Sequence, residues 1–154
     1  MRPAAHCMKQ NGEILSVTDV LIILGRYNIK EWENDDLESV QRRPSEIVVH
    51  PDYKKASADA DISIIVLEKE VRFTKFIKPI CLWNENTNLN LVVSESGVVA
   101  GWGKDEKGVI VSPVPKQVTL PIVSQEDCIR SHETFHDITS TRTFCAGECS
   151  HIAS

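Results

Sequence analysis

Short runs of β-branched and aliphatic residues, separated by turns, constrain the fold of this chain most strongly. The candidate strands are Val20–Leu24, Ile47–Val49, Ile62–Leu67, Gly97–Ala100, Val118–Ile122 and Phe144–Ala146. Helix signals are scarce, and the clearest is Ser124–Asp127, which resembles a capping box and predicts a short helix ending near Arg130. Many short strands with almost no helix predict an all-β barrel or sandwich.

The segments between these runs are mostly polar. Asn28–Gln41 is strongly acidic, and both it and the polar segment Asn84–Asn90 are predicted to be exposed loops. In Val118–Ile122 apolar residues alternate with polar residues or with Pro121. This alternation predicts a half-buried strand whose proline is compatible with a sheet edge.

Length and charge limit the classes of function. With 154 residues the chain suits one ordinary domain. The formal net charge is −5, which disfavours nucleic acid as a partner because nucleic acids attract basic patches. No apolar run approaches the roughly 18 residues that span a bilayer, so no membrane partner is expected. Residues 1–12 also lack the apolar stretch of a secretory signal peptide.

The number of cysteines is unexpected in a chain whose first residues do not resemble a signal peptide. The chain contains Cys7, Cys81, Cys128, Cys145 and Cys149. Their odd number and irregular spacing match neither a zinc pattern nor a Cys-x-x-Cys redox pair. Five cysteines without an export signal lead us to expect missing sequence upstream of Met1. A cytosolic protein with buried free thiols is the alternative.

His6 and Asp61 are the first candidates for chemistry. Asp61 opens the run DISIIVL, where a carboxylate is costly unless a charged or hydrogen-bonding group meets it. A histidine imidazole is one suitable partner, because an aspartate that accepts its Nδ1–H fixes the tautomer and stabilises the imidazolium. From these two residues alone, the favoured explanation is an aspartate that caps a strand and a surface histidine, because a spacing of 55 residues is only a weak signal.

Six segments, read in order, resemble one known family, the chymotrypsin/trypsin-like serine peptidases (peptidase family S1). They are AAHC at 4–7, ADISIIVLEKEV at 60–71, FIKPICLW at 76–83, VVAGWG at 98–103, Cys128 after LPIVSQED, and TFCAG at 143–147. The first two are similar to the histidine and aspartate motifs of that family, and the fourth is close to its VAGWG turn. No one segment would suffice alone.

The resemblance implies a fold and a set of roles. The implied fold is a chymotrypsin-like double Greek-key β-barrel, here an incomplete domain with most of the first barrel and the start of the second. By resemblance His6 is the general base, Asp61 its orienting carboxylate, and Cys128 and Cys145 a disulfide. Protein or peptide substrates or inhibitors are the implied partners, in an extracellular setting.

No cofactor is implied, and no metal is expected. Some family members bind calcium in the loop that follows the segment matching Leu24-Gly25. Their first ligand is a glutamate, whereas this chain has Arg26 at that position. We therefore expect the acids Glu31, Glu33, Asp35 and Asp36 to form a solvated loop.

The chain also departs from the family pattern. It contains no Gly-Asp-Ser-Gly-Gly segment, which carries the nucleophilic serine, and reads FCAGECSHIAS instead. We expect residues 1–147 to be a partial peptidase domain and residues 148–154 a non-homologous tail. Ser150 and Ser154 are not expected to act as the nucleophile, because nothing around them supplies the strained turn or the oxyanion donors. The specificity pocket is missing too.

Three cysteines lack their family partners. Cys7 and Cys81 would pair with cysteines before Met1, and Cys149 follows Cys145 too closely to match the next family cysteine.

Three hypotheses follow. The first is a truncated serine endopeptidase that is inactive as this 154-residue chain. The second is a non-catalytic serine-protease homologue that binds or regulates a partner. The third, more distant, is a metal-binding protein that uses His6 and Cys7.

Overall fold

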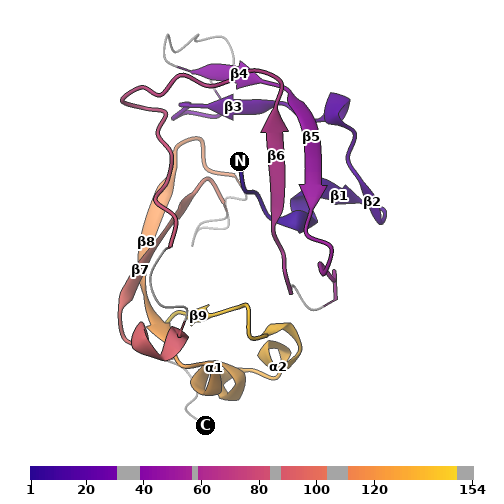
Figure 1. Ribbon diagram of the computed structural model, residues 1–154. Helices are drawn as coiled ribbons and strands as arrows, with labels where there is room; N and C mark the ends of the chain where they lie inside the picture. Colours follow the sequence, from indigo (N-terminus) through magenta and orange to yellow (C-terminus); the bar gives the residue numbers. More distant parts are fainter. Residues whose placement is uncertain (31–38, 57–58, 84–87, 104–110, 149–154) are drawn as a thin grey trace. The chain divides into compact units, whose positions relative to one another are not determined.

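The computed structural model describes residues 1–30, 39–56, 59–83, 88–103 and 111–148 (Figure 1). The chain divides into two compact units. The first contains Met1–Tyr53 and Asp61–Trp83, and the second contains Lys54–Ala60 and Asn84–Ser154. Each unit is described by itself.

The prediction of an all-β chain is confirmed. Strands β1 to β9 make up four small antiparallel sheets, whereas the helices are short. Over the described ranges these sheets do not close into a barrel, which is consistent with a partial chymotrypsin-like fold. No helix in the same ranges is long and apolar enough to cross a membrane.

The first unit begins with a 3₁₀ helix and a tight hairpin. Helix η1 is Ala5–Met8, and β1 (Lys9–Gln10) pairs with β2 (Glu13–Ile14). Asn11 and Gly12 connect the two strands, and both have positive φ, +52° and +89°. An Asn-Gly pair favours this turn because both residues tolerate the left-handed region. This hairpin was not among the predicted strands.

Two further strand pairs complete the first unit. After the 3₁₀ turn η2 (Val17–Asp19), β3 (Ile22–Leu24) pairs with β4 (Val40–Arg42). Strand β5 (Pro44–Val49) then pairs with β6 (Ser63–Leu67), and the two lie side by side in Figure 1.

Strand β6 carries the buried centre of the first unit. Ser63 and Ile65 are buried, and so are Ile22, Pro44 and Ile77 elsewhere in this unit. Ile64, between Ser63 and Ile65, faces the other way and is 48% exposed, as the two-residue period of a strand requires.

The second unit is a three-stranded sheet followed by helices. Strand β7 (Ser96–Gly101) pairs with β8 (Lys116–Val123), and β8 pairs with β9 (Cys145–Ala146). Pro121, which is compatible with a sheet edge, therefore lies in the central strand of the three. The ladder between β8 and β9 is short and ends beside this proline, where the Gly147 N–H donates to the Pro121 carbonyl. Because the ladder ends at Pro121, the missing N–H of this proline leaves the hydrogen bonds between β8 and β9 intact.

The predicted helix is present. Helix α1 is Gln125–Ser131, and the Ser124 side chain caps it by accepting from the Asp127 N–H at 3.0 Å. Helix α2 (Thr134–Ile138) was not predicted.

Both predicted loops were partly wrong. The acidic segment Asn28–Gln41 ends in β4, and Asn84–Asn90 runs into the 3₁₀ turn η3 (Leu89–Leu91). The rest of each segment, including the four acids considered for calcium, lies largely outside the described residues.

Candidate active site

Backbone pairing along β6 brings the start of the chain toward Asp61. The Ser63 N–H donates to the Pro3 carbonyl at 2.8 Å, and the Ile65 N–H donates to the Met1 carbonyl at 2.9 Å. The buried Ser63 hydroxyl adds a second bond to Pro3, at 3.0 Å. This antiparallel register, continued by two residues, brings Ala5 opposite Asp61.

Helix η1 then places His6. Ala4 is extended, and η1 begins at Ala5, whose side chain is fully buried. The next residue, His6, therefore turns outward, and its side chain is 63% exposed. Small alanines before the histidine allow the 3₁₀ turn to pack closely while the imidazole stays accessible.

Both carboxylate oxygens of Asp61 contact His6. The His6 N–H donates to Asp61 Oδ1 at 2.8 Å, and His6 Nδ1 lies 2.6 Å from Asp61 Oδ2. The Asp61 side chain is 22% exposed, so it is much less accessible to water than the ring it holds. An ionised carboxylate only accepts hydrogen bonds, so Nδ1 carries a proton and Nε2 is the ring nitrogen left for proton exchange.

The hydrogen bonds to Asp61 determine its ionisation. Partial burial raises the pKa of the Asp61 carboxyl, but the bonds from the His6 ring and from the backbone N–H groups of His6 and Ala5 outweigh this effect. The net result is a pKa below the ordinary value, so Asp61 is a carboxylate at neutral pH. The arrangement is an imidazole whose Nδ1 faces a charged acceptor.

Tyr53 is a neighbour of this pair that sequence reasoning missed. Its phenol pKa is raised by burial and by electrostatic interaction with Asp61 and Cys7. The Lys9 ammonium lies 5.6 Å from the centre of the Tyr53 ring, a cation–π contact. Nothing in the segment HPDY at 50–53 indicated this position, because it depends on how β5 and β6 are joined.

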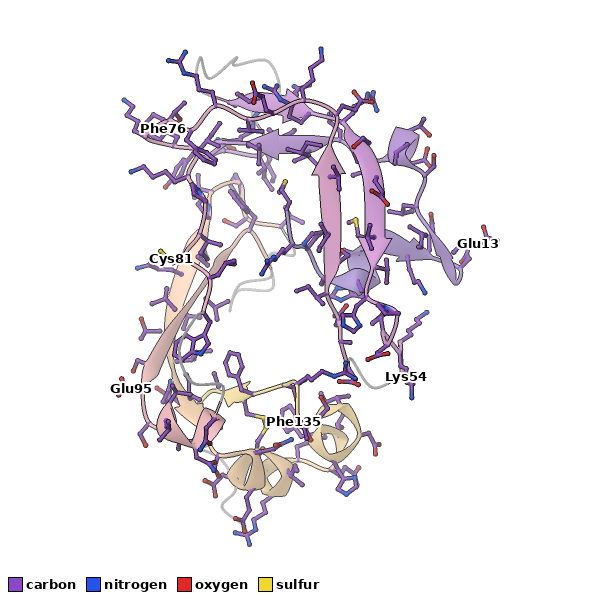
Figure 2. All side chains as sticks on the ribbon, viewed as in Figure 1. Glu13, Lys54, Phe76, Cys81, Glu95 and Phe135 are labelled. Atoms are coloured by element: carbon purple, nitrogen blue, oxygen red, sulfur yellow. A yellow bond between two sulfur atoms is a disulfide. The ribbon has the colours of Figure 1, made fainter. Side chains whose placement is uncertain are left out.

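The other residues considered from the sequence are cysteines and serines in both units and outside the described ranges. A disulfide joins Cys128 of α1 to Cys145 of β9, the pairing that the resemblance implied. Cys7 and Cys81 are free and exposed, and Figure 2 labels Cys81. Cys149, Ser150 and Ser154 lie outside the described residues.

No metal site emerges from the part of the chain that the structure describes. Within it, no group of three or more histidine, cysteine or acidic side chains is placed to hold an ion. The described side-chain contact of His6 is with the single carboxylate of Asp61.

Comparison with known proteins gives the family. The model of the Trypsin family matches residues 3–153, nearly the whole chain. This chain belongs to the chymotrypsin/trypsin-like serine peptidase family.

Three curated proteins are similar to this trypsin-like chain. Serine protease gd of Drosophila melanogaster is 36% identical over 161 residues, which cover 94% of this chain and 30% of that protein. A venom protease of Bombus pensylvanicus is 30% identical, and the match covers 94% of this chain and 55% of that protease. Phenoloxidase-activating enzyme 1 of Spodoptera litura is 32% identical, and the match covers 94% of this chain and 39% of that enzyme. The chain thus spans about a third to a half of these relatives.

Proposed function

We propose that His6 and Asp61 are the general base and its orienting carboxylate in a serine endopeptidase. The observation that carries this proposal is the two-point contact between them, with Nδ1 and Oδ2 2.6 Å apart. Membership in a peptidase family supports it, because the two residues lie in the segments that match the histidine and aspartate motifs of that family.

The geometry suits proton transfer. Asp61 holds the Nδ1–H, so Nε2 is free to accept the proton of a serine hydroxyl as that oxygen attacks a peptide carbonyl. The imidazolium that forms is stabilised by the Asp61 carboxylate, and it returns the proton to the leaving amine. The substrate class is therefore a protein or peptide, and an inhibitor of similar shape is the other expected partner.

The 154 residues contain no Gly-Asp-Ser-Gly-Gly segment. We therefore propose that this polypeptide does not hydrolyse peptide bonds by itself, since neither the nucleophile nor its oxyanion donors are present. The same observation favours a second candidate function, a non-catalytic homologue that binds or regulates a partner.

The disulfide supports an oxidising compartment for the protein. Cys128 and Cys145 are paired, and such bonds persist in secreted proteins but are rare in the cytosol. Secretion is accordingly part of the proposal.

Two measurements test the proposal. A fluorophosphonate probe, which labels activated serines, is expected to leave the 154-residue chain unlabelled. The transcript that encodes the chain is then sequenced in both directions, and any longer product that carries the nucleophile segment is assayed on peptide substrates. In that product we expect Asp61→Asn to lower kcat by a factor on the order of 10⁴, because the wrong tautomer is favoured.

His136→Ala is the matched control, because His136 also lies beside an aspartate, Asp137, but both are largely exposed. Labelling of the 154-residue chain would contradict the proposed inactivity. Full activity of Asp61→Asn would contradict the role of Asp61. An expressed protein that has no longer, active form would favour the non-catalytic function.

A further inference from the structure

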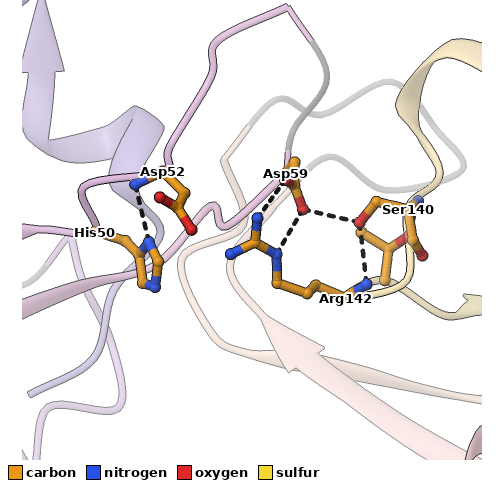
Figure 3. Close-up of polar contacts among 6 residues, drawn as sticks. His50, Asp52, Asp59, Ser140 and Arg142 are labelled. Atoms are coloured by element: carbon orange, nitrogen blue, oxygen red, sulfur yellow. Dashed lines mark hydrogen bonds and ion pairs between the residues drawn. The ribbon is translucent and has the colours of Figure 1, made fainter.

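A second carboxylate, Asp59, is held in place two residues before Asp61. Ser140 Oγ donates to Asp59 Oδ1 at 2.9 Å, and Arg142 Nε donates to the same oxygen at 3.1 Å. Arg142 Nη2 donates to Asp59 Oδ2 at 2.7 Å (Figure 3). Arginine thus grips both carboxylate oxygens, an arrangement that fixes orientation as well as charge.

The turn that carries Ser140 and Arg142 is itself well ordered by hydrogen bonds. The Ser140 N–H donates to Thr143 Oγ1 at 2.7 Å, and the Arg142 N–H donates to Ser140 Oγ at 3.1 Å. Gln125 of α1 donates to the Ser140 carbonyl at 3.2 Å. Shortly after the turn, the disulfide at Cys145 connects the chain to α1. The groups that grip Asp59 are therefore positioned in advance.

Ala60, between the two aspartates, has an unusual backbone conformation. Its φ is +53°, in the left-handed region that residues other than glycine and asparagine adopt only at an energetic cost. Its N–H donates to the Asp59 carboxylate, and its side chain is buried. Strained residues of this kind persist only where the surrounding contacts hold them, and they gather at functional sites. Here Asp59, with its contacts, directly precedes Ala60 in the chain, and Asp61 directly follows it.

The charge of Asp59 is favoured by the same contacts. The hydrogen bonds from Ser140 and Arg142 lower the pKa of the Asp59 carboxyl below its ordinary value and outweigh burial, which raises it. Asp59 is therefore a carboxylate at neutral pH, able to accept all of these bonds at once.

We propose that Asp59, Ser140 and Arg142 form a clamp that keeps Ala60 in its left-handed conformation and thereby presents Asp61 to His6. The three are positioning residues that act through Asp61. This inference rests on the proposed function, because it concerns the delivery of the carboxylate that orients the base.

The test follows the Nδ1 proton of His6 by NMR in the 154-residue chain. A proton held between Nδ1 and a carboxylate resonates at low field and exchanges slowly with water. In Ser140→Ala and in Arg142→Gln we expect this exchange to be faster by about five-fold, the effect of losing a typical hydrogen bond. Arg142→Lys keeps the charge without the two-point grip, so its exchange rate is expected to be intermediate.

Arg130→Gln is the matched control. Arg130 forms an exposed ion pair with Glu126 in α1, so its loss removes one arginine–carboxylate contact away from the clamp. Far-UV circular dichroism checks that each variant is folded, and Ser140→Ala decides the question if Arg142→Gln is not.

The possible outcomes separate this inference from the proposed function. If the low-field proton is present and Asp61→Asn removes it, the His6–Asp61 pair exists. Unchanged exchange in the clamp variants then overturns the clamp alone, as does an equal effect of Arg130→Gln. If the wild-type chain shows no low-field proton that depends on Asp61, both the clamp and the proposed role of Asp61 are overturned.

Discussion

The Cys128–Cys145 disulfide gives a prediction whose size follows from the chain itself. The bond closes a loop with a sequence separation of 17 residues, and this loop contains Ser140 and Arg142. In the chain-entropy model, closing a loop of that length removes enough freedom from the unfolded chain to stabilise the fold by about 3 kcal/mol. Cys128 is buried, so the perturbation is the double variant Cys128→Ala/Cys145→Ala, which leaves no buried polar group.

The assay is urea unfolding followed by far-UV circular dichroism. With a slope of about 2 kcal/mol per molar urea, a loss of about 3 kcal/mol lowers the midpoint by about 1.5 M. Cys81→Ser is the control, because Cys81 is free and exposed, and it is expected to leave the midpoint unchanged. A shift below about 0.5 M in the double variant, or an equal shift in the control, would refute the reasoning.

Three further predictions concern packing, pH and helix capping. Ile65→Ala is expected to cost about 2–5 kcal/mol of unfolding free energy because Ile65 is 4% exposed, whereas Ile64→Ala on the open face should cost much less; urea midpoints compare them. Asp61 and Asp59 have lowered pKa values, so the stability they give is full above their ordinary value near 3.8 and is lost as pH falls through the lower folded values. The free energy of unfolding, measured from about pH 6 to pH 3, should fall less steeply in Asp59→Asn and Asp61→Asn than in the wild type. Parallel plots of this free energy against pH would contradict the prediction. Ser124→Ala removes the N-cap of α1 and is expected to cost about 1 kcal/mol, visible as faster amide exchange in that helix but not in β5.

The strands that sequence predicted well are those with a strong apolar pattern. The runs at 62–67 and 97–100 became β6 and β7, within one residue at each end. The Ser124 cap also acts as its local sequence indicated, because capping depends on residues that are neighbours in the chain.

Missed elements fall into two kinds. The Asn11-Gly12 hairpin carried a recognised local signal and was predictable. By contrast, β4 consists of Val40, Gln41 and Arg42, which have no apolar alternation, and it is a strand only because β3 pairs with it.

The candidate site divides in the same way. The family motifs around His6 and Asp61 were visible in the sequence, although their contact spans 55 positions. Asp59 and Arg142 are 83 positions apart and belong to no motif that we recognised, so only the fold brings them together. Tyr53 likewise became a neighbour of the pair through tertiary structure alone.

The tautomer of the His6 ring tests the central claim most directly. Ring ¹⁵N shifts of the 154-residue chain are measured at alkaline pH, where imidazole is neutral, in the wild type, Asp61→Asn and Asp137→Asn. The account predicts that His6 carries its proton on Nδ1 in the wild type and loses this preference in Asp61→Asn. Asp137→Asn is the control, because Asp137 is an exposed aspartate beside a different histidine, and it should leave the His6 tautomer unchanged. A His6 ring with the same tautomer distribution in all three proteins would contradict the claim that Asp61 orients the base.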